Sequence, residues 1–267
     1  MKQYYAFFKI KVIASLQYRA AAIAGVLTQF FFGFTFIMVY YAFYNSNDMV
    51  GPMEFSSLVT YIWLQQAFYA LTYAFHKEKD IITMIKDGNV AYELCRPGNL
   101  YLKWYTRILA SKYSGFILRF LPIIIITSLL PYPFSLGLPI NIYGFIGFLI
   151  TLILASFLIT AIVTIIHILM FYTIDSKGIL TLFGVITELF SGTIVPIPFL
   201  PNIVKQIATY LPFQYIADVP YRLYTGDISY METSKMVILQ ILWILIMMVI
   251  GYFLSRKVLK KAIVQGG

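Results

Sequence analysis

The chain has 267 residues, of which 60% are hydrophobic and only 12% are charged, and its formal net charge is +9. Because soluble domains carry about 25% charged residues, this composition excludes an ordinary soluble protein and indicates a surface that mostly faces lipid. A basic chain can bind nucleic acid, but here the Lys and Arg residues lie mostly between apolar runs, so we expect no nucleic-acid partner. Cys95 is the only cysteine, which excludes an internal disulfide and leaves no cysteine cluster for a metal.

The N-terminal segment from Lys2 to Arg19 mixes aromatic residues with lysines. Aromatic rings such as those of Tyr4 and Phe7 suit the headgroup zone, where lysines reach anionic lipids. The pattern predicts an N-terminal interfacial helix; a basic flank of the first membrane span is the equal alternative.

Stretches without Asp, Glu, Lys or Arg mark the membrane spans, because about 20 helical residues cross the hydrocarbon core of a bilayer. The longest such stretch, 120–174, is broken by prolines at 131, 133 and 139, so it holds two spans. Segment 178–199 is apolar apart from Glu188 and runs into prolines at its far end. The six expected spans are about 20–44, 55–75, 113–130, 140–172, 178–199 and 236–255.

Two short apolar segments, 204–210 and 215–224, follow the fifth expected span and are separated by Pro212. Neither is long enough to cross the bilayer, and short segments at membrane depth must be buried in protein or line a cavity. We therefore expect a re-entrant helical pair before the last span. The predicted fold class is an all-α membrane protein that forms one transmembrane domain over residues 1–267.

Positive charge is distributed unequally between the two expected sides, and Lys and Arg concentrate on the cytoplasmic side of membrane proteins. With six spans, both termini lie on one side. That side holds the basic residues 2, 9, 11 and 19, those from 77 to 112, residue 177 and the group at 256–261. The other side holds only Lys205, Arg222 and Lys235. Both termini are therefore expected in the cytoplasm.

The longest expected cytoplasmic segment, from His76 to Arg107, contains a short amphipathic stretch. Ile81, Ile82 and Ile85 fall on one face of a helix, and Gly88 suits its C-terminal stop. Such a helix could dock a cytoplasmic partner, or it could lie on the lipid surface as a solvated loop helix. Periodicity alone favours the second interpretation.

Several short motifs mark this segment and the region before the last span. They are Ile85-Lys-Asp-Gly88, Leu94-Cys-Arg-Pro97, Phe199-Leu-Pro201, Leu211-Pro-Phe213 and the run from Val219 to Gly226. Each motif is loose by itself. Their order and spacing cover essentially the whole chain, and together they resemble the pattern of ABC-2 type transporter permeases.

The resemblance implies a permease that pairs with a second permease, the same chain or a related one, and that binds two ATPase subunits. Those subunits would hold ATP and Mg²⁺, with no cofactor in this chain. The helix after the second span is similar to the coupling helix that sits in a groove of the ATPase. By that analogy the residues at the ATPase contact are Asp80, Ile82, Ile85, Asp87, Gly88 and Arg96. The implied location is the plasma membrane of a bacterial cell.

A carboxylate, a guanidinium group and an imidazole fall inside the expected spans. Glu188 lies mid-span, where an unpaired carboxylate is costly, so we expect it to line the translocation pathway or a dimer interface. A structural hydrogen bond between helices is the alternative. Arg119 suits either snorkelling to the headgroups or an ion pair with Glu188, and His167 suits a hydrogen bond between helices.

Familiar catalytic motifs do not occur in the sequence. It contains neither a G-x-x-x-x-G-K-[ST] phosphate loop nor an H-E-x-x-H motif, so we expect no enzyme activity and no metal in this chain. The leading hypothesis is the membrane subunit of an ATP-driven exporter. An ATP-independent secondary carrier and a membrane scaffold or immunity protein are the alternatives, and a neighbouring ATPase gene would favour the first.

Overall fold

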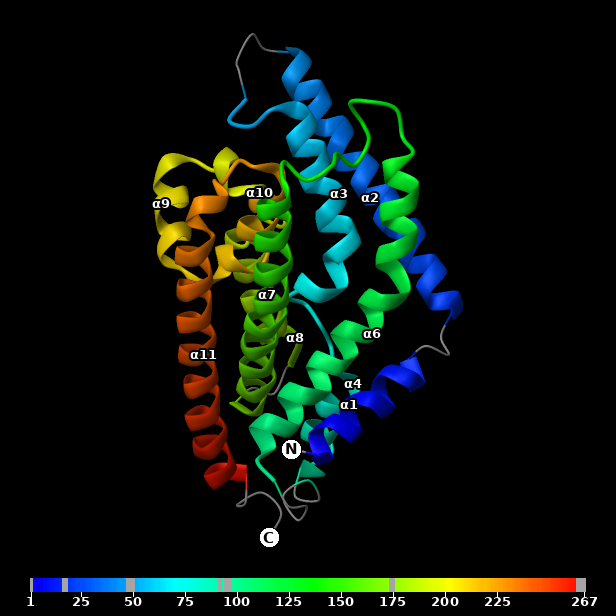
Figure 1. Cartoon of the computed structure of the whole chain (residues 1–267). Coiled ribbons are helices and arrows are strands. Elements are labelled where there is room, and N and C mark those ends of the chain that lie inside the picture. Colours follow the sequence, from blue (N-terminus) through cyan, green and yellow to red (C-terminus); the bar gives the residue numbers. More distant parts are fainter. Residues whose placement is uncertain are drawn as a thin grey trace.

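The computed structural model describes residues 2–15, 19–46, 51–90, 93, 98–172 and 176–262. Over these residues every regular element is helical, which confirms the predicted all-α class (Figure 1). The α-helices are α1 (Lys2–Ser15), α2 (Arg19–Ser46), α3 (Phe55–Thr72), α4 (Lys79–Lys86), α6 (Leu100–Ser128), α7 (Ile142–Leu169), α8 (Ser176–Phe190), α9 (Asn202–Tyr210), α10 (Asp218–Thr225) and α11 (Thr233–Ala262). Short 3₁₀ turns lie at Met170–Tyr172, Ile197–Phe199, Pro212–Tyr215 and Tyr230–Glu232.

Four helical stretches of the described chain are long and apolar enough to cross a membrane. They are Ala22–Ser46, Leu100–Ser128, Ile142–Leu169 and Tyr230–Val258. The second and fifth expected spans do not belong to this set. Helix α3 has 18 residues and includes the adjacent polar pair Gln65 and Gln66, and α8 has only 15 residues. Six crossings therefore remain a prediction for α3 and α8.

Helix α6 differs most from its predicted bounds, because it begins at Leu100 rather than near residue 113. Asn99 provides the N-terminal cap, since its side-chain oxygen accepts a hydrogen bond of 3.2 Å from the backbone N–H of Leu102. The added first turns include the fully buried Trp104. A search for uncharged stretches missed them because Lys103 and other basic residues lie on these turns.

Helix α8 is shorter than its predicted span, because it ends at Phe190 rather than near residue 199. Gly192 adopts a φ of +81°, a left-handed conformation that stops a helix and that other residues rarely adopt. Pro196 follows and begins the 3₁₀ turn Ile197–Phe199. Helices α2, α7 and α11 lie close to where the sequence predicted them.

Helix α3 packs on both α2 and α6, in the upper half of Figure 1. Helix α11 runs along α7, and α1 lies across the lower part of α6 (Figure 1). The rings of Phe8 on α1 and Tyr113 on α6 meet edge to face with 6.0 Å between their centroids. The expected N-terminal helix is therefore present, and it packs on the bundle; its position at the lipid surface stays a prediction.

The two short segments before the last span form helices α9 and α10, as predicted. Helix α10 packs against α7 and α3 and buries Val219, Tyr221 and Leu223 almost completely. Helix α9 exposes Ile203 and Ile207. The pair lies at the end of the bundle opposite to α1, α4 and the C-terminal end of α11 (Figure 1). Re-entry of this pair into the bilayer stays a prediction.

Candidate functional site

Helix α4 turns its apolar face inward, onto the protein itself. Ile81 is fully buried, and Ile82 and Ile85 are partly buried against the main hydrophobic core. Gly88 has a φ of +70°, and its N–H donates to the carbonyl oxygen of Ile85 at 3.4 Å, so it ends the helix as predicted. Two of the expected ATPase contacts therefore anchor α4 to the bundle.

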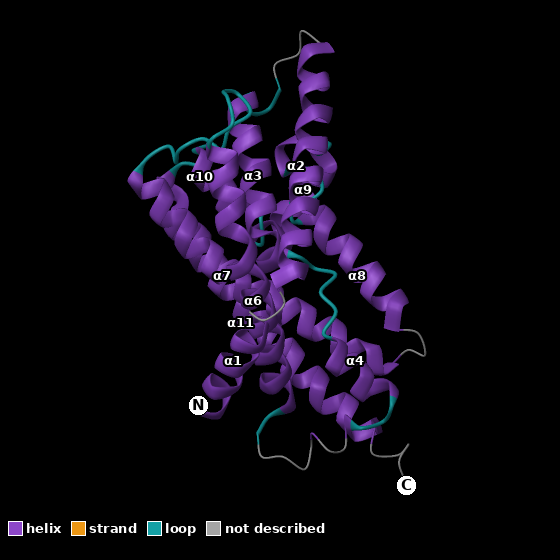
Figure 2. Ribbon diagram, turned by 90° about the vertical axis from the view of Figure 1, so that its right-hand side faces the viewer, coloured by secondary structure: helices purple, strands orange, loops and turns teal. Residues whose placement is uncertain are grey.

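The outward face of α4 is polar. We define it as Asp80, Thr83, Lys86 and Asp87, which are all exposed, as is Gly88 beyond the helix end. Arg96, the remaining residue of the expected contact, lies outside the described residues. Helix α4 lies at the same end of the molecule as α1 and the last turns of α11 (Figure 2). This polar surface is thus presented at the end where α1 and the C-terminal end of α11 lie.

Residues 73–78, which we call the connector, join α3 to α4 without regular structure. At its start, Lys112 of α6 is fully buried and its ammonium group donates to the carbonyl oxygens of Leu71 at 3.2 Å and Tyr73 at 2.6 Å. The last carbonyls of a helix have no intrahelical partner, and the C-terminal end of the helix dipole is negative. A buried cation at this point therefore satisfies the end of α3.

Glu188 of α8 holds the next residue of the connector. Its Oε1 accepts a hydrogen bond of 2.7 Å from the backbone N–H of Ala74, and the side chain is only 4% exposed. The carboxylate also interacts electrostatically with the Lys112 ammonium group. A third contact from α8 is steric, because Gly184 lies against the ring of Phe75 so closely that an added Cβ would approach it to 2.5 Å.

His167 of α7 holds the far end of the connector. Its Nδ1 lies 2.8 Å from the carbonyl oxygen of Val163, and because a carbonyl only accepts, this nitrogen carries the proton. Its Nε2 is then an acceptor, and the backbone N–H of Glu78 donates to it at 3.3 Å. His167 therefore makes a hydrogen bond to another segment, but this partner is the connector and not a second helix as predicted. Side chains from α6, α8 and α7 fix the connector along its length.

A polar cavity of about 300 Å³ lies beside the connector, between α2, α3 and the end of α8. Its lining residues are Thr28, Gln29, Phe32, Phe36, Gln65, Gln66, Tyr69, Tyr73, Phe75, Glu188, Thr193 and Ile194. Amide, hydroxyl and carboxylate groups lie among aromatic rings in this lining. Glu188 therefore lines a cavity and also makes a hydrogen bond to the connector. Its role in a translocation pathway or a dimer interface stays a prediction.

The turn after α8 borders this cavity through Thr193 and Ile194. Gln65 of α3 donates to the carbonyl oxygen of Thr193, and Tyr61 donates to the carbonyl oxygen of Gly192 at 2.9 Å. The fully buried Asp218 of α10 accepts from the backbone N–H of Ile197 at 3.1 Å and pairs with Arg222 at 3.2 Å. Burial raises the pKa of Asp218, and the Arg222 guanidinium opposes that rise.

Sequence reasoning missed Lys112, which it assigned to the cytoplasmic segment. The residue is in fact buried within α6, and it supplies the positive charge near Glu188. Arg119, which the sequence offered as a partner for Glu188, instead lies against Gly25 of α2, where an added Cβ would approach its guanidinium to 2.7 Å. The described residues hold no group of His, Cys, Asp and Glu side chains suited to a metal ion.

Comparison with known proteins identifies the family. Residues 30–266 match the family described as ABC-2 family transporter protein. A search of curated proteins found no match. The matched range contains α4, the connector and every residue that lines the polar cavity except Thr28 and Gln29. The chain therefore belongs to the ABC-2 transporter family, as a multi-pass membrane permease.

Proposed function

We propose that this chain is the permease subunit of an ATP-driven exporter, which moves its substrate out of the cell with energy from separate ATPase subunits. The observation that carries the proposal is the arrangement of α4. Its apolar face anchors it to the bundle, and its polar face is exposed at the end of the molecule that holds α1 and the C-terminal end of α11. ATP and Mg²⁺ would be bound by the partner, and this chain would hold no cofactor.

The outward face of α4 is the proposed ATPase contact. Its mixture of Asp80, Lys86 and Asp87 suits a partner surface that carries charges of both signs. Gly88 and Arg96 would extend this contact beyond the helix. Ile82 and Ile85 would act by anchoring α4, because their side chains pack on the core rather than pointing outward.

The connector would transmit movement of α4 into the bundle. Lys112 and Glu188 hold adjacent connector residues, and Glu188 also lines the polar cavity. A displacement of α4 therefore pulls on α6 and α8, and it moves a wall of the cavity. The cavity is our proposed part of the translocation pathway, with Glu188 as its charged residue.

The proposed topology has six crossings, with α3 and α8 as the shorter two and α9–α10 as a re-entrant pair. An even number of crossings agrees with terminal helices at one end of the bundle (Figure 1). The basic residues concentrate toward that end, which supports cytoplasmic termini in a bacterial plasma membrane. This orientation would place α4 in the cytoplasm, where an ATPase is available.

A second permease would complete the pathway. Exposed apolar residues lie on the two helices that flank the cavity, Phe31 and Phe32 on α2 and Leu182 and Val185 on α8. A second permease packed on these helices would close the cavity from outside. A Val185→Cys variant in a Cys95→Ser background should form a cross-linked dimer in membranes, whereas Ile150→Cys on the lipid-facing side of α7 should not.

Copurification tests the function itself. The tagged chain should be coexpressed with the ATPase that is encoded beside it, extracted in mild detergent and assayed for vanadate-sensitive ATP hydrolysis after reconstitution. We expect a stable complex that hydrolyses ATP. A chain that purifies without an ATPase, and that moves substrate in response to an ion gradient, would instead support the secondary carrier. Binding of a toxin without any transport would support the scaffold or immunity protein.

A further inference from the structure

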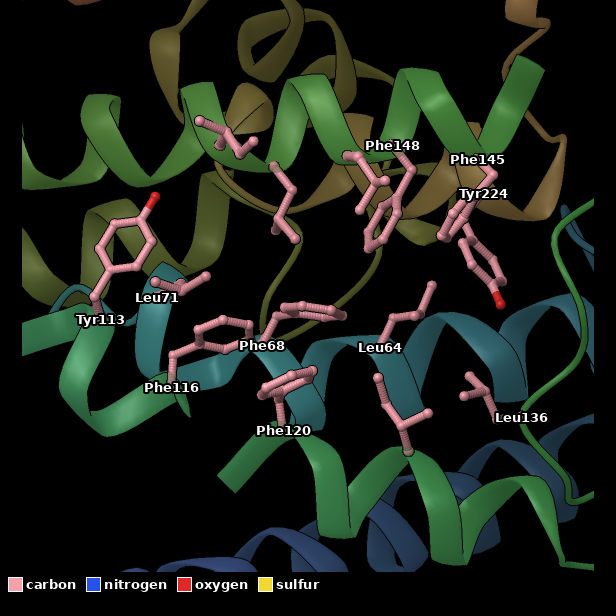
Figure 3. A pocket seen from close by; sticks show the side chains of 14 residues that line it. Leu64, Phe68, Leu71, Tyr113, Phe116, Phe120, Leu136, Phe145, Phe148 and Tyr224 are labelled. Atoms are coloured by element: carbon pink, nitrogen blue, oxygen red, sulfur yellow. The ribbon is translucent and has the colours of Figure 1, made fainter. Parts of the chain in front are cut away.

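A second pocket lies between α3, α6 and α7 (Figure 3). Its volume is about 400 Å³, within the range of about 300–1,000 Å³ that is usual for ligand pockets. Phe68 of α3 and Phe116 of α6 stack with 5.4 Å between ring centroids, and Phe148 of α7 meets Phe68 edge to face at the same distance. Figure 3 shows the three rings in the lining of the pocket. Because Phe68 and Phe148 are almost fully buried, we call these rings the deep wall.

The lining of this pocket provides only apolar chemistry. The hydroxyl groups in its wall belong to Tyr113 and Tyr224, and both are already engaged. The Tyr113 hydroxyl lies 3.0 Å from Oγ of Ser156, and the Tyr224 hydroxyl donates to the carbonyl oxygen of Gly137 at 3.1 Å. Because a polar ligand group would lose its hydrogen bonds to water here without gaining others, the chemistry selects a hydrocarbon ligand.

The rim of the pocket belongs to the lipid-facing surface. Leu149 and Ile153 of α7 line the pocket and are 41% and 52% exposed. On α6, Leu121 and Ile125 are exposed at 52% and 58%, next to pocket residues of the same helix. Both helices are candidate membrane spans, so acyl chains surround this rim. A chain can enter from the bilayer without crossing a polar surface.

We propose that this pocket binds the acyl chain of a membrane lipid. Helix α3 separates the bound chain from the polar cavity, because Leu64, Phe68 and Leu71 line the apolar pocket while Gln65 and Tyr69 line the cavity. An acyl chain bound there would pack against the apolar face of α3. It would thereby keep the polar face of α3 turned toward the cavity. The proposal does not depend on the ATPase partner, since it requires only that α6 and α7 lie in the bilayer.

Photolabelling tests this proposal. The purified full chain is reconstituted into nanodiscs of phosphatidylcholine that carries a diazirine in the middle of one acyl chain, irradiated and mapped by mass spectrometry. We expect adducts on Phe116 and Phe148, which lie in the deep wall, as well as on lipid-facing Leu245 of α11. Adducts confined to exposed positions such as Leu245 would overturn the proposal.

A variant with a tryptophan at the rim of the pocket, compared with one that has a tryptophan elsewhere on α7, provides a matched control. Leu149→Trp places a bulky ring at the mouth, and Ile146→Trp places the same ring on an exposed position of α7 that does not line the pocket. The first variant should lose the deep adducts and keep those on α11, whereas the second should keep both. If Leu149→Trp does not elute as a single species, Ile153→Trp serves in its place. Deep adducts that persist in a folded rim variant would also overturn the proposal.

Discussion

Lys112 and Glu188 hold two consecutive residues of the same backbone segment, Tyr73 and Ala74. The Lys112 ammonium donates to the carbonyl oxygen of Tyr73 at 2.6 Å, and the Glu188 carboxylate accepts from the N–H of Ala74 at 2.7 Å. Both side chains are buried, and they come from different helices, α6 and α8. They thereby tie the end of α3, and the path toward α4, to the rest of the bundle.

Substitution of Glu188 separates its hydrogen bond from its charge. Glu188→Gln retains an oxygen that can accept from Ala74, whereas Glu188→Leu leaves that buried N–H without a partner, which costs about 1–3 kcal/mol. We expect Glu188→Leu to lower the temperature at which the detergent-solubilised protein aggregates, and Glu188→Gln to lower it less. A Glu188→Leu protein as heat-resistant as wild type would contradict the hydrogen bond to Ala74.

Lys112 should be more sensitive to substitution than its place among cytoplasmic basic residues suggested. Lys112→Met leaves two carbonyl oxygens and the Glu188 carboxylate without their buried cation, and removing one partner of a buried charge pair costs about 3–5 kcal/mol. The same heating assay checks this loss. Adding Glu188→Leu to Lys112→Met should cost less than the sum of the two single changes, because the groups interact. Additive losses would contradict their interaction.

The outward face of α4 should control binding of the ATPase without affecting the fold. Asp87→Lys reverses an exposed charge, so we expect less ATPase to copurify while the permease elutes normally on size exclusion. Glu232→Lys makes the same charge change at an exposed residue near the start of α11, at the opposite end of the bundle, and should leave copurification unchanged. Equal binding in both variants would count against α4 as the contact.

Gly88 should resist substitution because of its backbone conformation. At a φ of +70° an alanine costs about 1–2 kcal/mol. Gly88→Ala should therefore loosen the C-terminal end of α4, which hydrogen exchange of the α4 amides would detect. Gly178→Ala is the control, since Gly178 is exposed in α8 with open space around it. Unchanged exchange in Gly88→Ala would show that α4 does not need this turn.

Asp218 should stabilise the turn after α8. Asp218→Ala leaves the N–H of Ile197 without its acceptor and deprives Arg222 of one carboxylate, whereas Asp218→Asn keeps an oxygen for Ile197. We expect the alanine variant to aggregate at a lower temperature than the asparagine variant. Identical behaviour of the two would show that this hydrogen bond contributes nothing.

The sequence predicted the parts of this fold whose signals are local. Long uncharged stretches located α2, α7 and α11, the isoleucines and Gly88 located α4, and the prolines on either side marked α9. The start of α6 was missed because basic residues on its first turns break the uncharged run. Trp104 shows that these turns are nevertheless buried. A search for uncharged stretches therefore misses the part of a helix that carries basic residues, even where neighbouring helices bury that part.

The contacts of the candidate site depend on the tertiary arrangement and have no local signal. Lys112 meets Tyr73 across 39 residues of sequence, and Glu188 meets Ala74 across 114. In the sequence, a lysine beside an apolar run gives the same pattern whether it lies in a loop or is buried against the C-terminal end of another helix. Glu188 could be singled out because a lone carboxylate in an apolar stretch is costly, but its partner could not.

Cross-linking from α4 tests the central claim, that this helix docks an ATPase, most directly. A Thr83→Cys variant in the Cys95→Ser background carries one cysteine, on the outward face of α4, for a maleimide–diazirine reagent. After irradiation of membranes in which the neighbouring ATPase is coexpressed, we expect an adduct that contains a protein with a phosphate-loop motif. Glu232→Cys, at the opposite end, should give no such adduct. An exposed Thr83→Cys that reacts with the maleimide yet captures no ATPase would contradict the account.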